Sequence, residues 1–218
     1  MDRENHASLY DGCKLSYGKM LRYRHSDMAE LEKCLQKVPE TAGALIVTDG
    51  VFSMGGDIAK LPEICALAEK YGVDTSDDAI RAAIEKHNRL CRVITEIGDL
   101  RKAENPVITG YEFHVLNLVS FTCPKYLILP YLRETLTELK KRKPDPKPAF
   151  RARVAIVGSE IDDPQLTKLI EGCGALVVSD RYCFGSTPGR EIIELKDDED
   201  ALPQICMHIM QHSECARY

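Results

Sequence analysis

The stretch RVAIVGSEIDDPQLTKLIEGCGALVVSD, residues 153–180, decides the fold of the C-terminal part of the chain. Residues 153–158 and 175–179 are short β-branched runs, and Asp163 followed by Pro164 predicts that a helix begins between them. A strand, a helix and a second strand form a right-handed βαβ unit, so the two strands are expected to be parallel neighbours. Their carboxyl ends then meet at one edge of a sheet, which is where open α/β sheets bind ligands.

Polar residues follow both predicted strands at this edge. Ser159 and Glu160 come directly after the first strand, and Cys183 comes shortly after the second. Ser159 and Glu160 either contact a substrate or simply close the turn, and both interpretations stay open. We take them as the candidate catalytic residues.

Upstream of this unit, the sequence first alternates helix and strand and then becomes helical. LIVTDGVF, residues 45–52, has the composition of a buried parallel strand that ends in a loop. A third C-terminal strand is expected over about residues 190–195. Helical spacing predicts helices over residues 28–38, 61–71, 76 to Pro106, 111–120, 126–140 and 199–212. The expected fold class is α/β: a strand–helix fragment (1–73), a helical segment with a basic linker (74–148), and a Rossmann-like βαβ module with a parallel sheet (149–218).

Composition excludes several classes of protein. The 218 residues carry 29 basic and 34 acidic side chains, a net charge of −5, which does not favour nucleic-acid binding. The longest apolar stretch, residues 126–132, is interrupted by proline and is far shorter than a bilayer span of about 20 residues. The first residues have no pattern of a secretory signal, so we expect a cytoplasmic protein. The nine cysteines include no CxxC pair and are expected to be reduced thiols.

The first third of the sequence resembles the α-oxoamine synthases, which are fold-type I pyridoxal-phosphate enzymes that condense an amino acid with an acyl-CoA. The resemblance lies in NHAS (5–8), RYRHSDM (22–28) and TDGVFSM (48–54). It implies that His6 stacks on the pyridine ring and that Asp49 and Ser53 lie beside the cofactor. Read alone, His6 is typical of an ordinary surface histidine, and no cofactor lysine can be nominated.

The last two thirds resemble the D-component type of the 2-hydroxyacyl-CoA dehydratase and benzoyl-CoA reductase family. This resemblance lies in residues 71–101, in VAIVGSEIDDP (154–164) and in GALVVSDRYCFG (174–185). It implies an acyl-CoA substrate, a second dehydratase-type subunit, an ATP-dependent activator, and a [4Fe–4S] cluster held by three cysteines, one iron of which acts as a Lewis acid. Cys183 is then the candidate metal ligand, and its alternative is a half-buried structural thiol.

Both resemblances pass through LAEKYGV, residues 67–73, so we infer a chimera that joins two incomplete modules. The expected function is that of a partial iron–sulfur dehydratase subunit (a lyase) fused to a partial pyridoxal-phosphate enzyme, inactive by itself. Two alternatives remain. One is a protein of the α-oxoamine synthase or aminotransferase class I/II type, and the other is a folded chimera without enzymatic activity.

Overall fold

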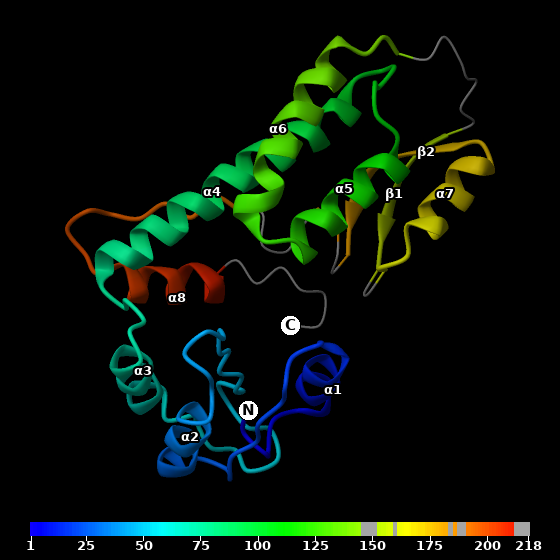
Figure 1. Ribbon diagram of the computed structural model, residues 1–218. Coiled ribbons are helices and arrows are strands. Elements are labelled where there is room, and N and C mark those ends of the chain that lie inside the picture. Colours follow the sequence, from blue (N-terminus) through cyan, green and yellow to red (C-terminus); the bar gives the residue numbers. More distant parts are fainter. Residues whose placement is uncertain (145–151, 159–160, 183–184, 187–190, 212–218) are drawn as a thin grey trace. The chain divides into compact units, whose positions relative to one another are not determined.

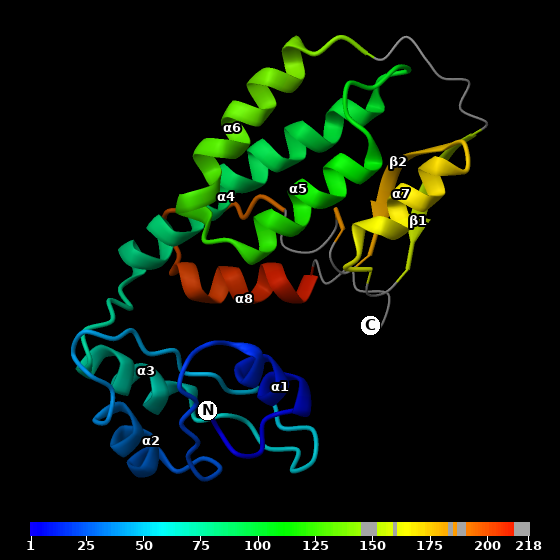
Figure 2. The same ribbon diagram turned by 45° about the vertical axis from the view of Figure 1, so that its right-hand side comes forward.

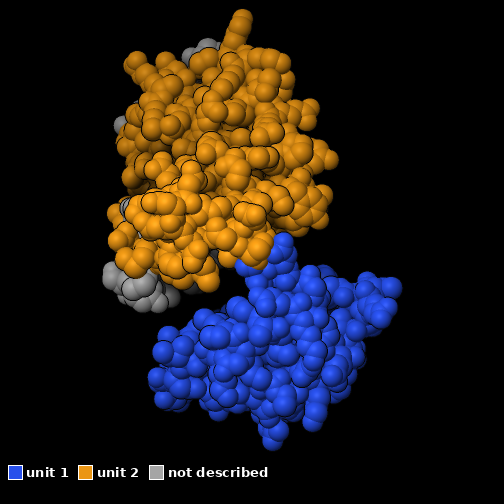
Figure 3. Space-filling model, turned by 90° about the vertical axis from the view of Figure 1, so that its left-hand side faces the viewer, with its two compact units in different colours: residues 1–75 blue, residues 76–218 orange. Residues whose placement is uncertain are grey.

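The computed structural model describes residues 1–144, 152–158, 161–182, 185–186 and 191–211. The chain forms two compact units, unit 1 (residues 1–75) and unit 2 (residues 76–218), which Figure 3 colours separately. Unit 1 contains α1 (Ala7–Leu15), α2 (Met28–Leu35) and α3 (Leu61–Lys70). Unit 2 contains α4 (Asp77–Asp99), a 3-10 turn (Leu100–Lys102), α5 (Gly110–Thr122), α6 (Lys125–Lys141), β1 (Ala152–Val157), α7 (Pro164–Gly172), β2 (Ala175–Arg181) and α8 (Ala201–Gln211).

The predicted βαβ unit is confirmed. β1 and β2 pair in parallel, from Ala152 opposite Ala175 to Val157 opposite Arg181, with one register irregularity after Val154. α7 connects the two strands and packs beside them, as Figures 1 and 2 show. Together with the surrounding helices, this parallel sheet confirms the α/β fold class.

The main core of unit 2 lies between α4, α5 and α6. α4 buries apolar residues at helical spacing, Leu90, Val93, Ile94 and Ile97, which gives it one continuous apolar face. α5 and α6 close over this face with Phe113, Leu132, Leu136 and Leu139, and Ile108 adds to the core from the segment before α5. The helices predicted from residue 76 to residue 140 are therefore present, although α4 ends at Asp99, before Pro106.

A single carboxylate links the helical layer to the sheet. Glu171, at the end of α7, accepts hydrogen bonds from the backbone N–H groups of Gly110 (2.8 Å), Tyr111 (3.1 Å) and Val177 (3.2 Å). A negative charge at the N-terminus of α5 also opposes the positive end of the helix dipole. Gly110 is required here, because a Cβ atom at this position would lie 2.5 Å from the Cβ of Val177.

Two predicted strands are not formed. Residues 45–52 make no strand, and only Val51 forms an isolated bridge, with Ile58. A buried parallel strand needs neighbours for its backbone groups, and unit 1 supplies no other strand. Of the predicted strand over 190–195, residue 190 lies outside the described residues, and residues 191–195 have no strand structure. The final helix is confirmed as α8, and α1 was not predicted.

Among the helices that the structure describes, none has the length and the apolar character needed to cross a bilayer.

His25 joins three segments of unit 1. Its Nδ1 lies 3.1 Å from Oδ1 of Asp2, and its Nε2 lies 2.6 Å from Oδ2 of Asp57. Its ring meets the ring of Phe52 edge-on, with centroids 4.4 Å apart. The hydrogen bond to Asp57 is the main cause that raises the pKa of His25, while partial burial opposes it and Asp2 adds to it. The protonated imidazolium therefore stabilises the folded unit.

We predict that unit 1 loses stability as the pH rises through the raised pKa of His25. The contribution of His25 is fully present below about pH 6.5, the pKa of histidine in an unfolded chain, because the folded state holds the proton more tightly. Urea unfolding between pH 5 and 9 measures this dependence. His25→Gln should flatten it, and Glu40→Gln, an exposed change in the same unit, should leave it as in the wild type. An unchanged slope in His25→Gln would contradict the prediction.

Candidate functional site

The carboxyl ends of β1 and β2 lie side by side, as the sequence predicts. The N–H of Gly158 donates to the carbonyl of Arg181 at 3.1 Å, so the pairing continues to the very end of both strands. The two loops that follow therefore leave the sheet at the same edge. We call this place the sheet edge.

A buried ion pair fixes the loop that follows β2. Arg101, from the 3-10 turn, donates to Oδ2 of Asp180 at 2.9 Å, and the two side chains are only 6% and 2% exposed. Ser186 donates its hydroxyl to the same oxygen at 2.8 Å, and its backbone N–H donates to the other carboxylate oxygen. The guanidinium group of Arg101 also lies 3.8 Å from the centroid of the Phe113 ring. Because the charges are paired and hydrogen-bonded, the buried network is satisfied.

Two polar residues of α5, one turn apart, face the same region. His114 Nδ1 lies 2.9 Å from the hydroxyl of Thr167 on α7, and its ring tilts against that of Tyr182 with centroids 5.2 Å apart. Asn117 donates its amide N–H to the carbonyl of Gly185 at 2.7 Å. α5 thus holds both α7 and the loop after β2 in place.

His114 is a buried titratable group of α5. It is 1% exposed, and its Nε2 has no hydrogen-bond partner of ordinary geometry among the described residues. Burial is the main cause that lowers its pKa, and the Ile161 backbone and the charges of Asp180 and Asp163 oppose this. The neutral imidazole is therefore favoured, with one ring nitrogen as a donor and the other as an acceptor.

The predicted residues of this edge, Ser159, Glu160 and Cys183, lie outside the described residues, so their roles stay predictions. Sequence reasoning missed Arg101, His114 and Asn117. The one available signal was the i, i+3 spacing of His114 and Asn117 on a predicted helix with few charges.

The second set of predicted residues, in unit 1, is only partly brought together. The backbone N–H of His6 donates to Oδ2 of Asp49 at 2.6 Å. The His6 ring is exposed and caps α1, where Nδ1 accepts from the N–H of Ser8 at 3.2 Å. Ser53 lies in the exposed turn that follows Phe52, and within the fully described residues 1–75 no hydrogen bond joins it to the other two.

This set fits only part of what pyridoxal phosphate needs. The backbone of His6 contacts the carboxylate of Asp49, while the imidazole caps α1, and covalent attachment of the cofactor requires a lysine. Within residues 1–75, all of which are described, no hydrogen bond or ion pair connects a lysine to His6, Asp49 or Ser53. The role of these three residues toward a cofactor therefore stays a prediction.

In the part of the chain that the structure describes, no group of three His, Cys, Asp or Glu side chains is placed to hold a metal ion. Cys91 is buried and Cys173 is exposed. The described residues do not fit an iron–sulfur cluster, and we derive no step through one.

Comparison with known proteins separates the two parts of the chain. Residues 63–218, well over half of its length, match the family described as 2-hydroxyglutaryl-CoA dehydratase, D-component. The chain belongs to this dehydratase family. Residues 1–79 match the family described as aminotransferase class I and II. The chain therefore joins partial fragments of two families, as the two resemblances and the inferred chimera indicate.

Curated relatives match the aminotransferase-type part of the chain, and one of these matches covers more of the chain than residues 1–79. An 8-amino-7-oxononanoate synthase from Thermoanaerobacter pseudethanolicus is 46% identical over 121 residues, which cover 50% of this chain and 30% of that protein. A serine palmitoyltransferase from Bacteroides ovatus is 54% identical over 70 residues, which cover 32% of this chain and 18% of that protein. The dehydratase-family chain thus spans less than a third of the length of either relative.

Solved structures match the same fragment. A serine palmitoyltransferase from Sphingomonas wittichii is 46% identical, with a TM-score of 0.32, over 33% of this chain and 18% of that chain. A serine palmitoyltransferase from S. paucimobilis, solved with a bound PLP–myriocin aldimine, is 44% identical with a TM-score of 0.31 and the same coverage.

We predict that Arg101→Met destabilises the dehydratase-family part by about 3–5 kcal/mol, because Asp180 would keep a buried charge without its partner. Arg89→Met is the matched control, since its ion pair with Glu85 is exposed and should be worth less than about 1 kcal/mol. Urea unfolding followed by circular dichroism measures both. The double variant Arg101→Met/Asp180→Leu should recover most of the loss, and equal losses in Arg101→Met and Arg89→Met would contradict the assignment.

Proposed function

We propose that the dehydratase-family part binds an acyl-CoA thioester at the sheet edge, and that the chain by itself does not complete a dehydration. The observation that carries this proposal is that the family match over 63–218 includes a parallel strand pair whose carboxyl edge is backed by a buried polar network. Such an edge is the usual ligand site of open α/β sheets. A cytoplasmic location belongs to the same proposal.

The residues of this part have separate tasks in the proposal. Ser159 and Glu160 contact the thioester from the loop after β1, since a hydroxyl and a carboxyl group are suited to its carbonyl and hydroxyl oxygens. Arg101 and Asp180 are positioning residues, because they fix the loop after β2 against the helices. Such fixed geometry lowers the entropic cost of binding. His114, held neutral by burial, positions α7 through Thr167.

The radical chemistry of the family needs more than these residues. A bound iron–sulfur cluster would supply a Lewis-acidic iron and carry an electron. Cys183 is the ligand that we propose from this chain, and a second dehydratase-type subunit and an ATP-dependent activator complete the proposal. We therefore expect binding without turnover from the isolated chain.

Isothermal titration calorimetry with 2-hydroxyglutaryl-CoA tests this binding, with free CoA and free 2-hydroxyglutarate as comparisons. We expect the thioester to bind more tightly than either part, and Ser159→Ala/Glu160→Gln to weaken it about tenfold, because two hydrogen bonds to the ligand are lost. Glu104→Gln, an exposed change elsewhere in the same part, is the control. No heat of binding, equal affinity in the double variant, or release of a dehydrated product by the chain alone would overturn the proposal.

A second candidate function is binding of pyridoxal phosphate to unit 1 without a covalent bond. The 2.6 Å contact between the His6 backbone and Asp49 favours it, because it brings two of the three proposed cofactor contacts together. In this proposal the His6 ring stacks on the pyridine ring, and Asp49 and Ser53 provide polar contacts. The cofactor supplies an electron sink when it is bound.

We predict that equimolar pyridoxal phosphate followed by borohydride leaves no reduced adduct on the lysines of residues 1–75, because none of them is linked to the three candidate residues. Peptide mass spectrometry measures the adduct. Binding without a covalent bond is measured separately, as quenching of cofactor fluorescence that His6→Ala weakens. A stoichiometric adduct on one lysine would contradict the prediction, and quenching unchanged in His6→Ala would remove His6 from the site.

A further inference from the structure

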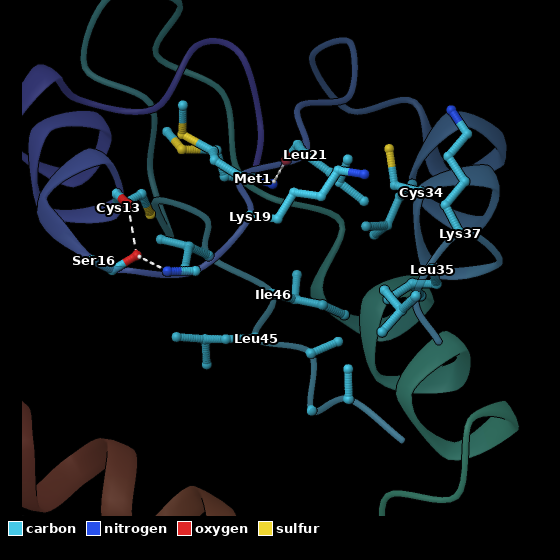
Figure 4. A pocket seen from close by; sticks show the side chains of 18 of the residues that line it. Met1, Cys13, Ser16, Lys19, Leu21, Cys34, Leu35, Lys37, Leu45 and Ile46 are labelled. Atoms are coloured by element: carbon cyan, nitrogen blue, oxygen red, sulfur yellow. Dashed lines mark hydrogen bonds between the residues drawn. The ribbon is translucent and has the colours of Figure 1, made fainter. Parts of the chain in front are cut away.

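Unit 1 contains a pocket of about 440 Å³ that neither family match assigns to a function. It lies between α1, the segment of residues 18–21, α2 and residues 38–47, as Figure 4 shows. Its volume falls within the range of small-molecule sites in proteins. His6, Asp49 and Ser53 are not among its lining residues, so it is separate from the proposed cofactor contacts.

The interior of the pocket is apolar. Its main lining side chains are Leu21, Leu31, Leu35, Val38, Leu45 and Ile46. Residues 44–47 are the start of the predicted strand that is not formed, and Leu45 remains 86% exposed. Because no strand covers this segment in unit 1, apolar surface that a complete sheet would bury stays accessible.

The charged groups of the lining all have one sign. Lys19 and Lys37 line the pocket, and none of its lining residues is an aspartate or a glutamate. In unit 1, every residue of which is described, no ion pair or hydrogen bond engages either ammonium group. Figure 4 shows Lys19 reaching from the 18–21 segment toward α2, which carries Cys34. Two uncompensated cations beside an apolar cavity fit a ligand with an aliphatic chain and an anionic head.

We propose that this pocket binds a medium-chain fatty carboxylate, with the alkyl chain among the leucines and the carboxylate beside Lys19 and Lys37. Charge complementarity selects this occupant over a strand of a second copy of the chain. A paired strand would need a regular edge, and residues 45–52, the strand-like stretch beside the pocket, have no strand structure. Such a strand would also leave the two ammonium groups without a partner.

A chain-length series on the full-length protein tests the apolar half of the proposal. Hexanoate, octanoate and decanoate are titrated below their micelle concentrations, with displacement of a fluorescent fatty acid as the readout. We expect the affinity to rise about fourfold for each added methylene group that is buried. Nonyltrimethylammonium has the same nine-carbon alkyl tail with the opposite charge, and it should bind at least about threefold more weakly than decanoate.

Two variants with matched controls test the site itself. Lys19→Gln/Lys37→Gln should weaken decanoate about threefold to tenfold, whereas Lys33→Gln, on α2 but outside the lining, should not. Ala42→Trp should fill the pocket and abolish binding of every chain length, whereas Ala29→Trp, an exposed position of α2 outside the lining, should not. Circular dichroism verifies that each variant is folded.

Three results would overturn the proposal. The first is equal binding of decanoate and nonyltrimethylammonium, which would mean that the lysines do not select the ligand. The second is unchanged decanoate binding in folded Ala42→Trp, which would place the ligand elsewhere. The third is a dimer in light scattering that Ala42→Trp dissociates and decanoate does not, which would identify a second copy as the occupant.

Discussion

The hydrogen bonding between β1 and β2 is the interaction on which the organisation of unit 2 depends. A strand is stable only where a neighbour satisfies its backbone groups, and each of these two strands supplies that neighbour for the other. The pairing places α7 beside the sheet, brings Glu171 to the start of α5, and sets Asp180 opposite Arg101. Unit 1 shows the converse, because residues 45–52 have the composition of a strand but no partner, and they remain irregular.

This constraint explains how much of the fold was predictable. The helices of residues 76–140 and the βαβ unit follow from local patterns, namely apolar spacing, the caps Ser76 and Asp163, and β-branched runs. The composition of residues 45–52 indicates a preference for an extended backbone. It does not indicate whether unit 1 contains another strand with which they could pair. α1 escaped prediction because it has no buried residue and hence no clear apolar face. Its one signal was the capping side chain of His6.

The candidate site was predictable to a smaller degree. The location of a sheet edge follows from the order of strand, helix and strand, which is why Ser159, Glu160 and Cys183 were chosen from the sequence. Arg101 and Asp180 lie 79 positions apart, so no local pattern indicates that they form a buried pair. His114 is similar, because on a helix it is indistinguishable from a solvent-exposed histidine until Thr167 and Tyr182 are placed against it. Buried polar partners are a property of tertiary packing.

α3 has a special position, since the two family matches overlap over residues 63–79. This helix ends at Lys70, and Gly72, with φ of +85°, adopts the left-handed conformation that stops it. An amphipathic helix that ends at a glycine occurs in many unrelated proteins. The same helix can therefore end the segment of one family and begin the segment of the other. A crossover within such a segment keeps the helical phase and leaves no buried backbone group without its bond. Gene fusion within this helix therefore costs little folding stability. We expect the junctions of other fused proteins to lie in similar amphipathic helices.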